Sequence, residues 1–209
     1  MATMSMNKAI HGAVRRDLRR FLEATASFSD GDTKRAAALG CAWDNFDTQL
    51  THHHEGEHEI AWPAMLALGI TQAQLDGFDA EHDTMSQALG KARLAMAAFR
   101  RSGAKADADA VHTAVSDLQS VTETHLGHEE DAVEQLMLDK ADDPIIKDMG
   151  RKFSKVSPAV GGVFFNWVRD GATADELAAI ERDIPKPVLA IIGGVFGRSY
   201  RKNIAPVWA

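Results

Sequence analysis

Residues 52–63 read His-His-His-Glu-Gly-Glu-His-Glu-Ile-Ala-Trp-Pro. Within them, His53 and Glu57 are four residues apart, a spacing that puts two side chains on one face of an α-helix. Apolar residues upstream recur at helical steps of 4, 3 and 4, and steps of 3 and 4 continue this stripe into His53 and Glu57. The apolar residues are Leu39, Trp43, Phe46 and Leu50. The pattern predicts a helix that points an imidazole and a carboxylate into an apolar interior.

A second stretch repeats this pattern. His125 and Glu129 are also four residues apart, and they continue a stripe that passes through Val121. Two further histidines lie near apolar stripes, His11 close to the face of Leu18 and His82 close to that of Phe78. His11 and His53 are 42 residues apart, and His82 and His125 are 43 apart. The chain therefore contains one hairpin pattern twice, each with two inward histidines and a glutamate.

Helical periodicity and the breakers between periodic stretches predict four long helices. A turn of residues 27–32 separates the first two, and Ser102-Gly103 closes the third. Short connections favour antiparallel neighbours, so we expect an all-α fold, an up-down-up-down four-helix bundle. The inward histidines of the last three helices lie about 30 Å from the turn end at ~1.5 Å per residue, and so share one level. The expected helices span residues 7–25, 33–62, 71–101 and 106–138.

The pattern changes near residue 140, and we expect a domain of residues 1–139 followed by a helical C-terminal extension of residues 140–209. The first part carries 12 Lys+Arg and 22 Asp+Glu, and the second carries 11 and 8. The acidic first part excludes nucleic acid as the expected partner. The extension has a possible capping box at Thr173 and Glu176, and repeats Gly-Gly-Val-Phe at 161–164 and 193–196. We expect the extension to pack on itself, on the bundle, or on a protein partner or second copy of the chain. The alternative is a surface site for a membrane beside Arg198, Arg201 and Lys202.

Composition is that of an ordinary soluble protein. Of 209 residues, 45% are apolar and 25% are charged. Cys41 is the single cysteine, which favours a reducing compartment, and we expect it to be a small buried residue. The first 25 residues lack the continuous apolar core of a signal peptide, and no apolar run reaches the ~20 residues of a membrane span. A cytoplasmic location without a transmembrane segment is predicted.

A bundle with these stripes receives four imidazoles and two carboxylates in its interior. Buried without partners, such groups would cost several kcal/mol each. A metal ion satisfies imidazole and carboxylate ligands together, which makes a metal site the simplest interpretation.

Residues 7–139 resemble the hemerythrin-like, HHE cation-binding family. The resemblance rests on four blocks in order: Ile10-His11 followed by Arg15-Arg16-Asp17-Leu18, residues 52–63, Glu81-His82, and residues 125–130. It implies two iron ions joined by an oxo or hydroxo bridge, with zinc as a possible substitute. The implied terminal ligands are His11, His53, His82 and His125, and the implied bridging ligands are Glu57 and Glu129.

Two alternatives concern the histidine-rich block. Residues 54–58 spell His-Glu-x-x-His, the motif of zinc proteases. This motif would need His58 on the inner face, whereas the stripe turns it outward, and it leaves His125 and Glu129 unexplained. The second alternative stays open, because a small rotation of the helix would bring His54 inward instead of His53. His112 and His128 lie off the inner stripe and are expected to be solvated, with His128 close enough to contact a ligand from outside.

The ligand count bears on function. Four histidines, two bridging glutamates and one oxo or hydroxo bridge would leave two of twelve coordination positions open. Oxygen-carrying members of the family use a fifth histidine, and the residue one turn after His82 is Ser86. We therefore expect reaction with hydrogen peroxide, dioxygen or nitric oxide, above all peroxide breakdown. The alternative is a non-catalytic oxygen, nitric oxide or iron-redox sensor, or an oxygen-binding protein. The sole tyrosine, Tyr200, is expected at an interface, or as the one phenol able to enter the metal site.

Overall fold

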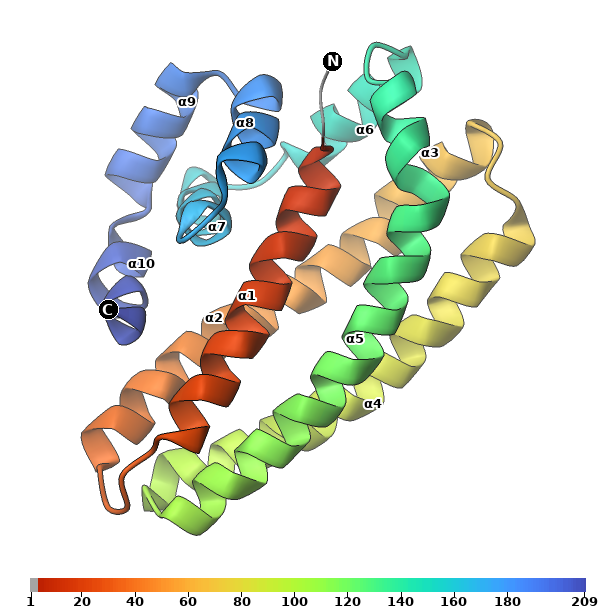
Figure 1. Ribbon diagram of the computed structural model, residues 1–209. Helices are drawn as coiled ribbons and strands as arrows, with labels where there is room; N and C mark the ends of the chain where they lie inside the picture. The colour runs from red at the N-terminus through yellow and green to blue at the C-terminus, as the bar shows by residue number, and fades with distance from the viewer. Residues whose placement is uncertain (1–3) are drawn as a thin grey trace.

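The computed structural model describes residues 4–209, and these residues contain helices and no strand. The chain begins with four long helices, arranged up-down-up-down as predicted (Figure 1). A shorter helical piece continues the second of them. The bundle elements are α1 (Met6–Ala26), α2 (Thr33–Gly56), the π-helical turn η1 (Glu57–Ala61), α3 (Trp62–Ala67), α4 (Gln72–Ser102) and α5 (Lys105–Asp139).

The ends of these helices follow from local capping. Asp32 accepts a hydrogen bond from the backbone N–H of Arg35 at the start of α2, as the turn signal predicts. Thr71 and Gln74 form a capping box at the start of α4. Gly103 ends α4 in the left-handed conformation with φ 61°, which a residue with a side chain rarely adopts. Three of the four predicted helices therefore have ends within one residue of those observed.

The second predicted helix differs, because it does not end at residues 62–63. At η1 the backbone N–H of Trp62 bonds to the carbonyl of Glu57, five residues back, and the chain stays helical to Ala67. Pro63 lies in the first turn of α3, where a backbone N–H is not needed. The wider turn thus lets the helix pass a proline that periodicity alone treats as a stop.

Two apolar clusters fill the interior of the bundle. The larger one lies toward the α1–α2 and α4–α5 turns, where Phe21 packs edge-to-face on Trp43 and Phe46. The smaller one lies at the opposite end and includes Trp62 and Phe78. The inward histidines and glutamates belong to neither cluster, and they occupy the level between them.

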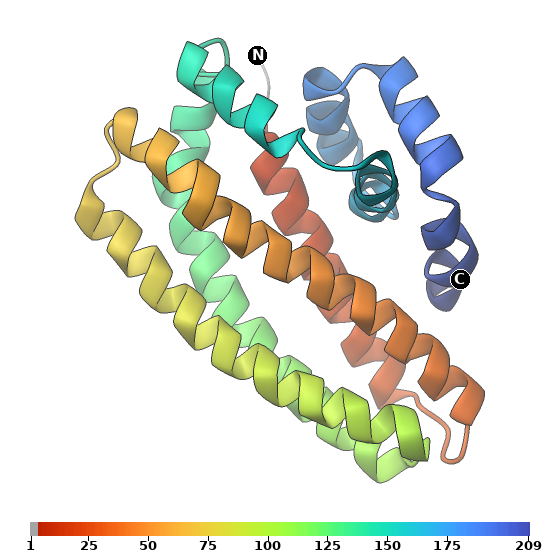
Figure 2. The same ribbon diagram turned by 180° about the vertical axis from the view of Figure 1, so that it is seen from behind.

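The extension is helical, as predicted, and lies beside α1 (Figure 2). Its Gly-Gly-Val-Phe repeats allow close packing within the extension, because a Cβ on Gly162 would meet the backbone of Phe196 at 2.5 Å. The elements are α6 (Pro144–Phe153), α7 (Pro158–Arg169), α8 (Ala174–Asp183), α9 (Lys186–Ile191), the π-helical turn η2 (Ile192–Phe196), α10 (Arg198–Asn203) and the 3₁₀ turn η3 (Ala205–Trp208). The predicted capping box of Thr173 and Glu176 starts α8.

A buried set of polar side chains joins the extension to α1, and we call it the extension cluster. Trp167, fully buried, donates from Nε1 to Asp17 Oδ2 at 2.8 Å. Arg16 donates to the Trp167 carbonyl at 3.0 Å, and Tyr200 donates to Asp170 Oδ2 at 2.8 Å. Tyr200 is therefore an interface residue of the extension, and its hydroxyl is committed to Asp170. The cluster comprises Arg16, Asp17, Arg20, Trp167, Asp170 and Tyr200.

Two glycines of the bundle receive side chains of the extension. A Cβ on Gly12 would lie 1.8 Å from Oε1 of Glu176, and one on Gly56 would lie 2.6 Å from the ring of Phe153. Gly12 follows His11 directly, and Gly56 precedes Glu57. The extension therefore contacts the bundle backbone beside two residues of the predicted metal site.

The expectation that Cys41 is buried is wrong, because this side chain is exposed. Cys41 lies two residues from both Leu39 and Trp43, about 200° around the helix from each, and so faces away from the core. Within residues 4–209, none of the helices combines the length and apolar character that a membrane crossing requires.

Candidate metal centre

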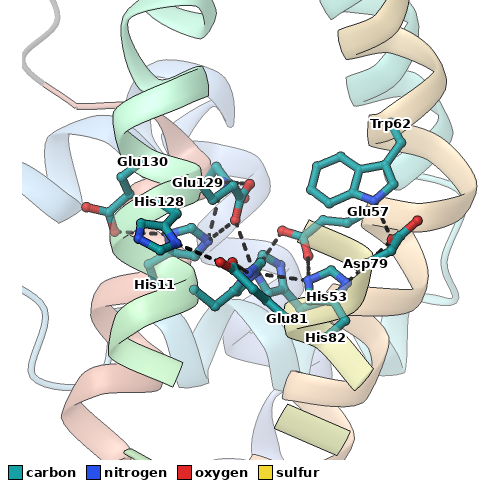
Figure 3. A network of polar contacts seen from close by, with 12 residues as sticks. His11, His53, Glu57, Trp62, Asp79, Glu81, His82, His128, Glu129 and Glu130 are labelled. Atoms are coloured by element: carbon teal, nitrogen blue, oxygen red, sulfur yellow. Dashed lines mark hydrogen bonds and ion pairs between the residues drawn. The ribbon is translucent and has the colours of Figure 1, made fainter. Parts of the chain in front are cut away.

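All six predicted ligands converge at one level of the bundle. Figure 3 labels His11, His53, Glu57, His82 and Glu129. α1 supplies His11, α2 and η1 supply His53 and Glu57, α4 supplies His82, and α5 supplies His125 and Glu129. His54 of α2 joins them. Together they form the histidine–glutamate cluster: His11, His53, His54, Glu57, His82, His125 and Glu129.

One half of this cluster lies toward α1. Nitrogen and oxygen atoms of His11, His53, Glu57 and Glu129 lie within 4.8 Å of one another. Nε2 of His11 is 3.2 Å from Oε2 of Glu129, and Nε2 of His53 is 3.0 Å from Oε1 of Glu57. His11, Glu57 and Glu129 are buried. This half presents two imidazoles and two carboxylates to a common point.

The other half lies toward α4. Here donor atoms of His54, Glu57, His82 and His125 meet within the same 4.8 Å limit. Nε2 of His82 is 3.3 Å from Oε2 of Glu57 and 3.0 Å from Nε2 of His125. Glu57 thus directs one oxygen to each half. Glu129 is less evenly placed, because its Oε2 lies 3.7 Å from Nε2 of His125 and its Oε1 accepts a hydrogen bond from Asn7 at 3.0 Å.

The sequence leaves open which of His53 and His54 faces the interior, and in the structure both imidazoles do. Taking Glu57 as the centre of the inner face at ~100° per residue, His53 lies about 40° to one side and His54 about 60° to the other. The two rings therefore diverge, His53 toward His11 and His54 toward His82. The sequence prediction missed that both angles are small enough for both side chains to face inward, because this helix packs against two neighbouring helices.

Carboxylates outside the cluster hold two of its imidazoles. Nδ1 of His11 is 3.0 Å from Glu130, which also accepts from Arg15 at 2.5 Å. Nδ1 of His125 is 3.0 Å from Oε2 of Glu81. These contacts leave the Nε2 atoms to face the interior, an orientation typical of imidazoles that bind metal.

The remaining two histidines of α5 differ from each other. His128 is 61% exposed and its Nδ1 lies 2.6 Å from Glu81, so it reaches the cluster through that carboxylate, as considered from the sequence. The expectation that His112 is solvated is wrong, because its Nδ1 packs 3.1 Å from the carbonyl of Leu22 on α1. Neither imidazole joins the cluster.

Charge within the cluster is set by burial and by mutual contact. Burial alone would lower the pKa of His11, but Glu129 and Glu130 outweigh it and raise that pKa to about 9. Burial lowers the pKa of His54 and of His125, with neighbouring imidazoles adding to the effect at His125. Burial would raise the pKa of Glu57, yet His53 and His82 hold it well below its usual range. In the half toward α4, the lowered pKa values of His54 and His125 favour their neutral forms, and the lowered pKa of Glu57 favours its ionised form.

Unpartnered atoms test whether a metal ion fits. Within residues 4–209, nine buried side-chain nitrogen or oxygen atoms form no well-aligned hydrogen bond, and five of them belong to this cluster. Four of these five lie 3.0–3.3 Å from an imidazole nitrogen or a carboxylate oxygen of the cluster, and Nε2 of His54 is the exception. Buried polar atoms that lack a well-aligned hydrogen bond cost free energy, up to about 1–3 kcal/mol for one with no partner, so their concentration at one place needs a reason. A cation supplies one, since lone pairs aimed at a common point are what it binds. The five are Nε2 of His53, Nε2 of His54, both oxygens of Glu57 and Oε2 of Glu129.

The zinc-protease interpretation of residues 54–58 does not fit this geometry. His58 is 69% exposed and points to Asp79, away from the cluster, whereas His54 points inward. The two histidines of that motif therefore do not share a metal.

A groove between α2 and α4 leads from the surface to the cluster. Its volume is about 450 Å³, and His54 and His82 form its inner wall. The half of the cluster toward α1 does not line it. Four carboxylates and one guanidinium also line the groove: Glu55, Glu59, Asp79, Asp83 and Arg93.

Fold and site together define a four-helix bundle with a histidine- and carboxylate-rich cation site. The hemerythrin HHE cation-binding domain model matches residues 5–136, and the chain belongs to this family. The match confirms the resemblance found in the sequence, and the family's cation binding agrees with the cluster. No curated protein and no solved structure matches the chain.

Proposed function

We propose that the chain binds two iron ions in the histidine–glutamate cluster, with zinc able to substitute. The predicted ligands are His11, His53, Glu57, His82, His125 and Glu129. Two observations support two metals rather than one. The donor atoms fall into two groups, and Glu57 belongs to both with one oxygen directed to each. Mixed imidazole and carboxylate donors suit iron.

We propose further that this centre reacts with hydrogen peroxide, dioxygen or nitric oxide, and above all that it breaks down hydrogen peroxide. Iron, when bound, supplies the electron transfer that such a reaction needs. The observation that carries the proposal is the groove between α2 and α4, which joins solvent to the His54 and His82 side of the cluster. The groove brings small molecules from solvent next to these two imidazoles.

The groove also bears on which molecules reach the cluster. Four carboxylates and one guanidinium line it, and Arg93 is already paired with Asp47. Like charges repel at this range, so the wall disfavours anions. Peroxide, dioxygen and nitric oxide are uncharged and avoid this penalty.

A second candidate is a non-catalytic sensor of oxygen, nitric oxide or iron redox state. The contacts of the extension favour it, because Glu176 packs on Gly12 beside His11, and Phe153 packs on Gly56 beside Glu57. A change in the position of either ligand would press directly on the extension. Apolar side chains exposed there could then meet a protein partner or a second copy of the chain: Ile191, Val195 and Phe196. For either function we propose a cytoplasmic location, and for the sensor we propose residues 140–209 as the relay.

Oxygen release distinguishes the two functions. Peroxide is added to iron-loaded chain, with zinc-loaded chain and iron-loaded His53→Ala as controls, and evolved oxygen is measured with an electrode. Enzymatic breakdown predicts many turnovers per chain for the iron form and loss of most activity in both controls. Equal oxygen release from all samples, or none from iron-loaded chain, would contradict the enzyme and leave the sensor as the better candidate.

A further inference from the structure

His54 is the one member of the histidine–glutamate cluster to which no role has been given. Its ring stacks on that of His82, with centroids 4.2 Å apart and planes 27° apart. Its centroid lies 5.8 Å from that of His125. His54 thus belongs to the half of the cluster toward α4, across the helix axis from His53.

The Nε2 atom of His54 has no hydrogen-bond partner although it is buried. One ring nitrogen of His54 lies within 4.8 Å of nitrogen or oxygen atoms of Glu57, His82 and His125. A histidine placed only for packing would satisfy this nitrogen with a backbone or side-chain group, as His112 does with Leu22. The nitrogen of His54 instead faces other electron-pair donors, an arrangement that a cation stabilises.

The opposite wall of the groove lacks an imidazole at the corresponding place. Ser86 of α4 lies one turn after His82 and lines the groove, and a serine side chain has no nitrogen to bind a metal ion. His54 reaches the same half from α2. His54 on the α2 wall of the groove thus supplies an imidazole that position 86 on the α4 wall does not.

We propose that His54 is a fifth imidazole ligand, bound to the metal ion on the His82 and His125 side of the cluster. This inference rests on the proposed metal centre. It makes the two metals unequal, with two imidazoles on one and three on the other. With seven ligand side chains instead of six, one coordination position fewer remains open. The position that His54 would occupy belongs to the metal ion nearest the groove. His54 therefore limits how a small molecule entering between α2 and α4 reaches that metal.

The test compares iron-loaded wild type, His54→Ala and His58→Ala by Mössbauer spectroscopy and iron analysis. His58 is a matched control, because it lines the same groove but points away from the cluster. We expect two distinct iron signals in wild type, of which His54→Ala changes one and His58→Ala changes none. We also expect the more weakly held iron of His54→Ala to bind roughly 10-fold less tightly or worse. His54→Gln, which keeps more of the side-chain volume, serves if His54→Ala does not fold.

Free imidazole supplies a second readout that a packing role would not give. Added to His54→Ala, it should enter the space left by the side chain and restore the wild-type iron signal, while leaving His58→Ala unchanged. Iron signals and affinity in His54→Ala equal to those of wild type would overturn the role of His54 but leave the metal centre standing. A wild-type chain that binds no iron would overturn both.

Discussion

Two polar clusters include residues of α1, and they differ in how completely their buried atoms are hydrogen-bonded. In the extension cluster, Asp17 accepts from Trp167 and Arg20, Asp170 accepts from Tyr200, and within that cluster only Nε of Arg16 lacks a partner. In the histidine–glutamate cluster, five buried atoms form no well-aligned hydrogen bond. The hydrogen bonds of the first cluster hold the extension in place. The second cluster instead brings together nitrogen and oxygen atoms of the kind that a cation binds.

The largest effect that tests this contrast is expected at Trp167. Trp167→Ala removes a fully buried side chain and one of the two hydrogen-bond donors to Asp17, which should cost about 3–5 kcal/mol of unfolding free energy. Urea denaturation measures it, with Val195→Ala on the exposed surface of the extension as a control expected to change stability little. Chain that remains folded should bind iron as wild type does. Loss of iron from folded Trp167→Ala would show that the two clusters are not separate.

Removal of a predicted metal ligand should instead lower the affinity for iron and leave the fold intact. His53→Ala and His125→Ala should each lower iron affinity by at least about 100-fold, or about 2.7 kcal/mol, because each removes an imidazole nitrogen that would bind iron. Competition with a chelator measures the affinity. His58→Ala and His112→Ala, on the same two stretches of helix, are the matched controls and should retain iron. An equal loss in all four variants would mean that the inward faces are wrongly assigned.

An intermediate effect is expected at a carboxylate outside the cluster. Glu81→Gln replaces the anion that holds Nδ1 of His125 and should lower iron affinity roughly 10- to 100-fold. Asp83→Asn, on the same helix and on the groove wall, is the control and should change it little. Should Glu81→Gln and Asp83→Asn bind iron equally well, the contact between Glu81 and His125 has no part in holding metal.

The smallest effect concerns the acidity of Asp17. Burial raises its pKa, and the hydrogen bond from Trp167 and the neighbouring guanidinium groups oppose this only in part. A carboxyl with a raised folded-state pKa gives a contribution to stability that is present below its unfolded pKa and lost as pH rises through the folded one. Asp17→Asn cannot titrate, so its stability relative to wild type should increase as the pH rises above about 4, the ordinary pKa of an aspartate. A constant difference over this range, measured by urea denaturation, would contradict the shift.

The histidine–glutamate cluster was largely readable from sequence because one rule, helical phase, governs it. Long helices carry enough apolar residues to fix that phase, and His53 and His125 follow from it. His54 was harder to assign to the inner face, because it lies about 60° from the centre of the stripe. At that angle, contact with two neighbouring helices decides whether a side chain faces inward. Glu81 was beyond reach for a different reason, because its role depends on where α5 places His125.

The extension was less predictable than the bundle. Its helices are short, between 6 and 12 residues, and such segments give few repeats from which to assign a buried face. The capping box at Thr173 was readable because capping is local. The pairing of Trp167 with Asp17 was not, because it joins residues 150 apart in sequence through a packing that no periodicity encodes.

The π-helical turn η1 divides one continuous helix into two independent frames. Inward residues before it advance by three or four, from Leu50 to His53 to Glu57, whereas the next buried residue, Trp62, comes after five. The extra residue changes the helical phase immediately after Glu57, so the inward-facing positions shift by one residue. The metal-facing segment can therefore keep the phase that its imidazoles require, while Trp62 and Met65 take the phase that suits the apolar cluster at that end of the bundle. A uniform α-helix would have to compromise between the two.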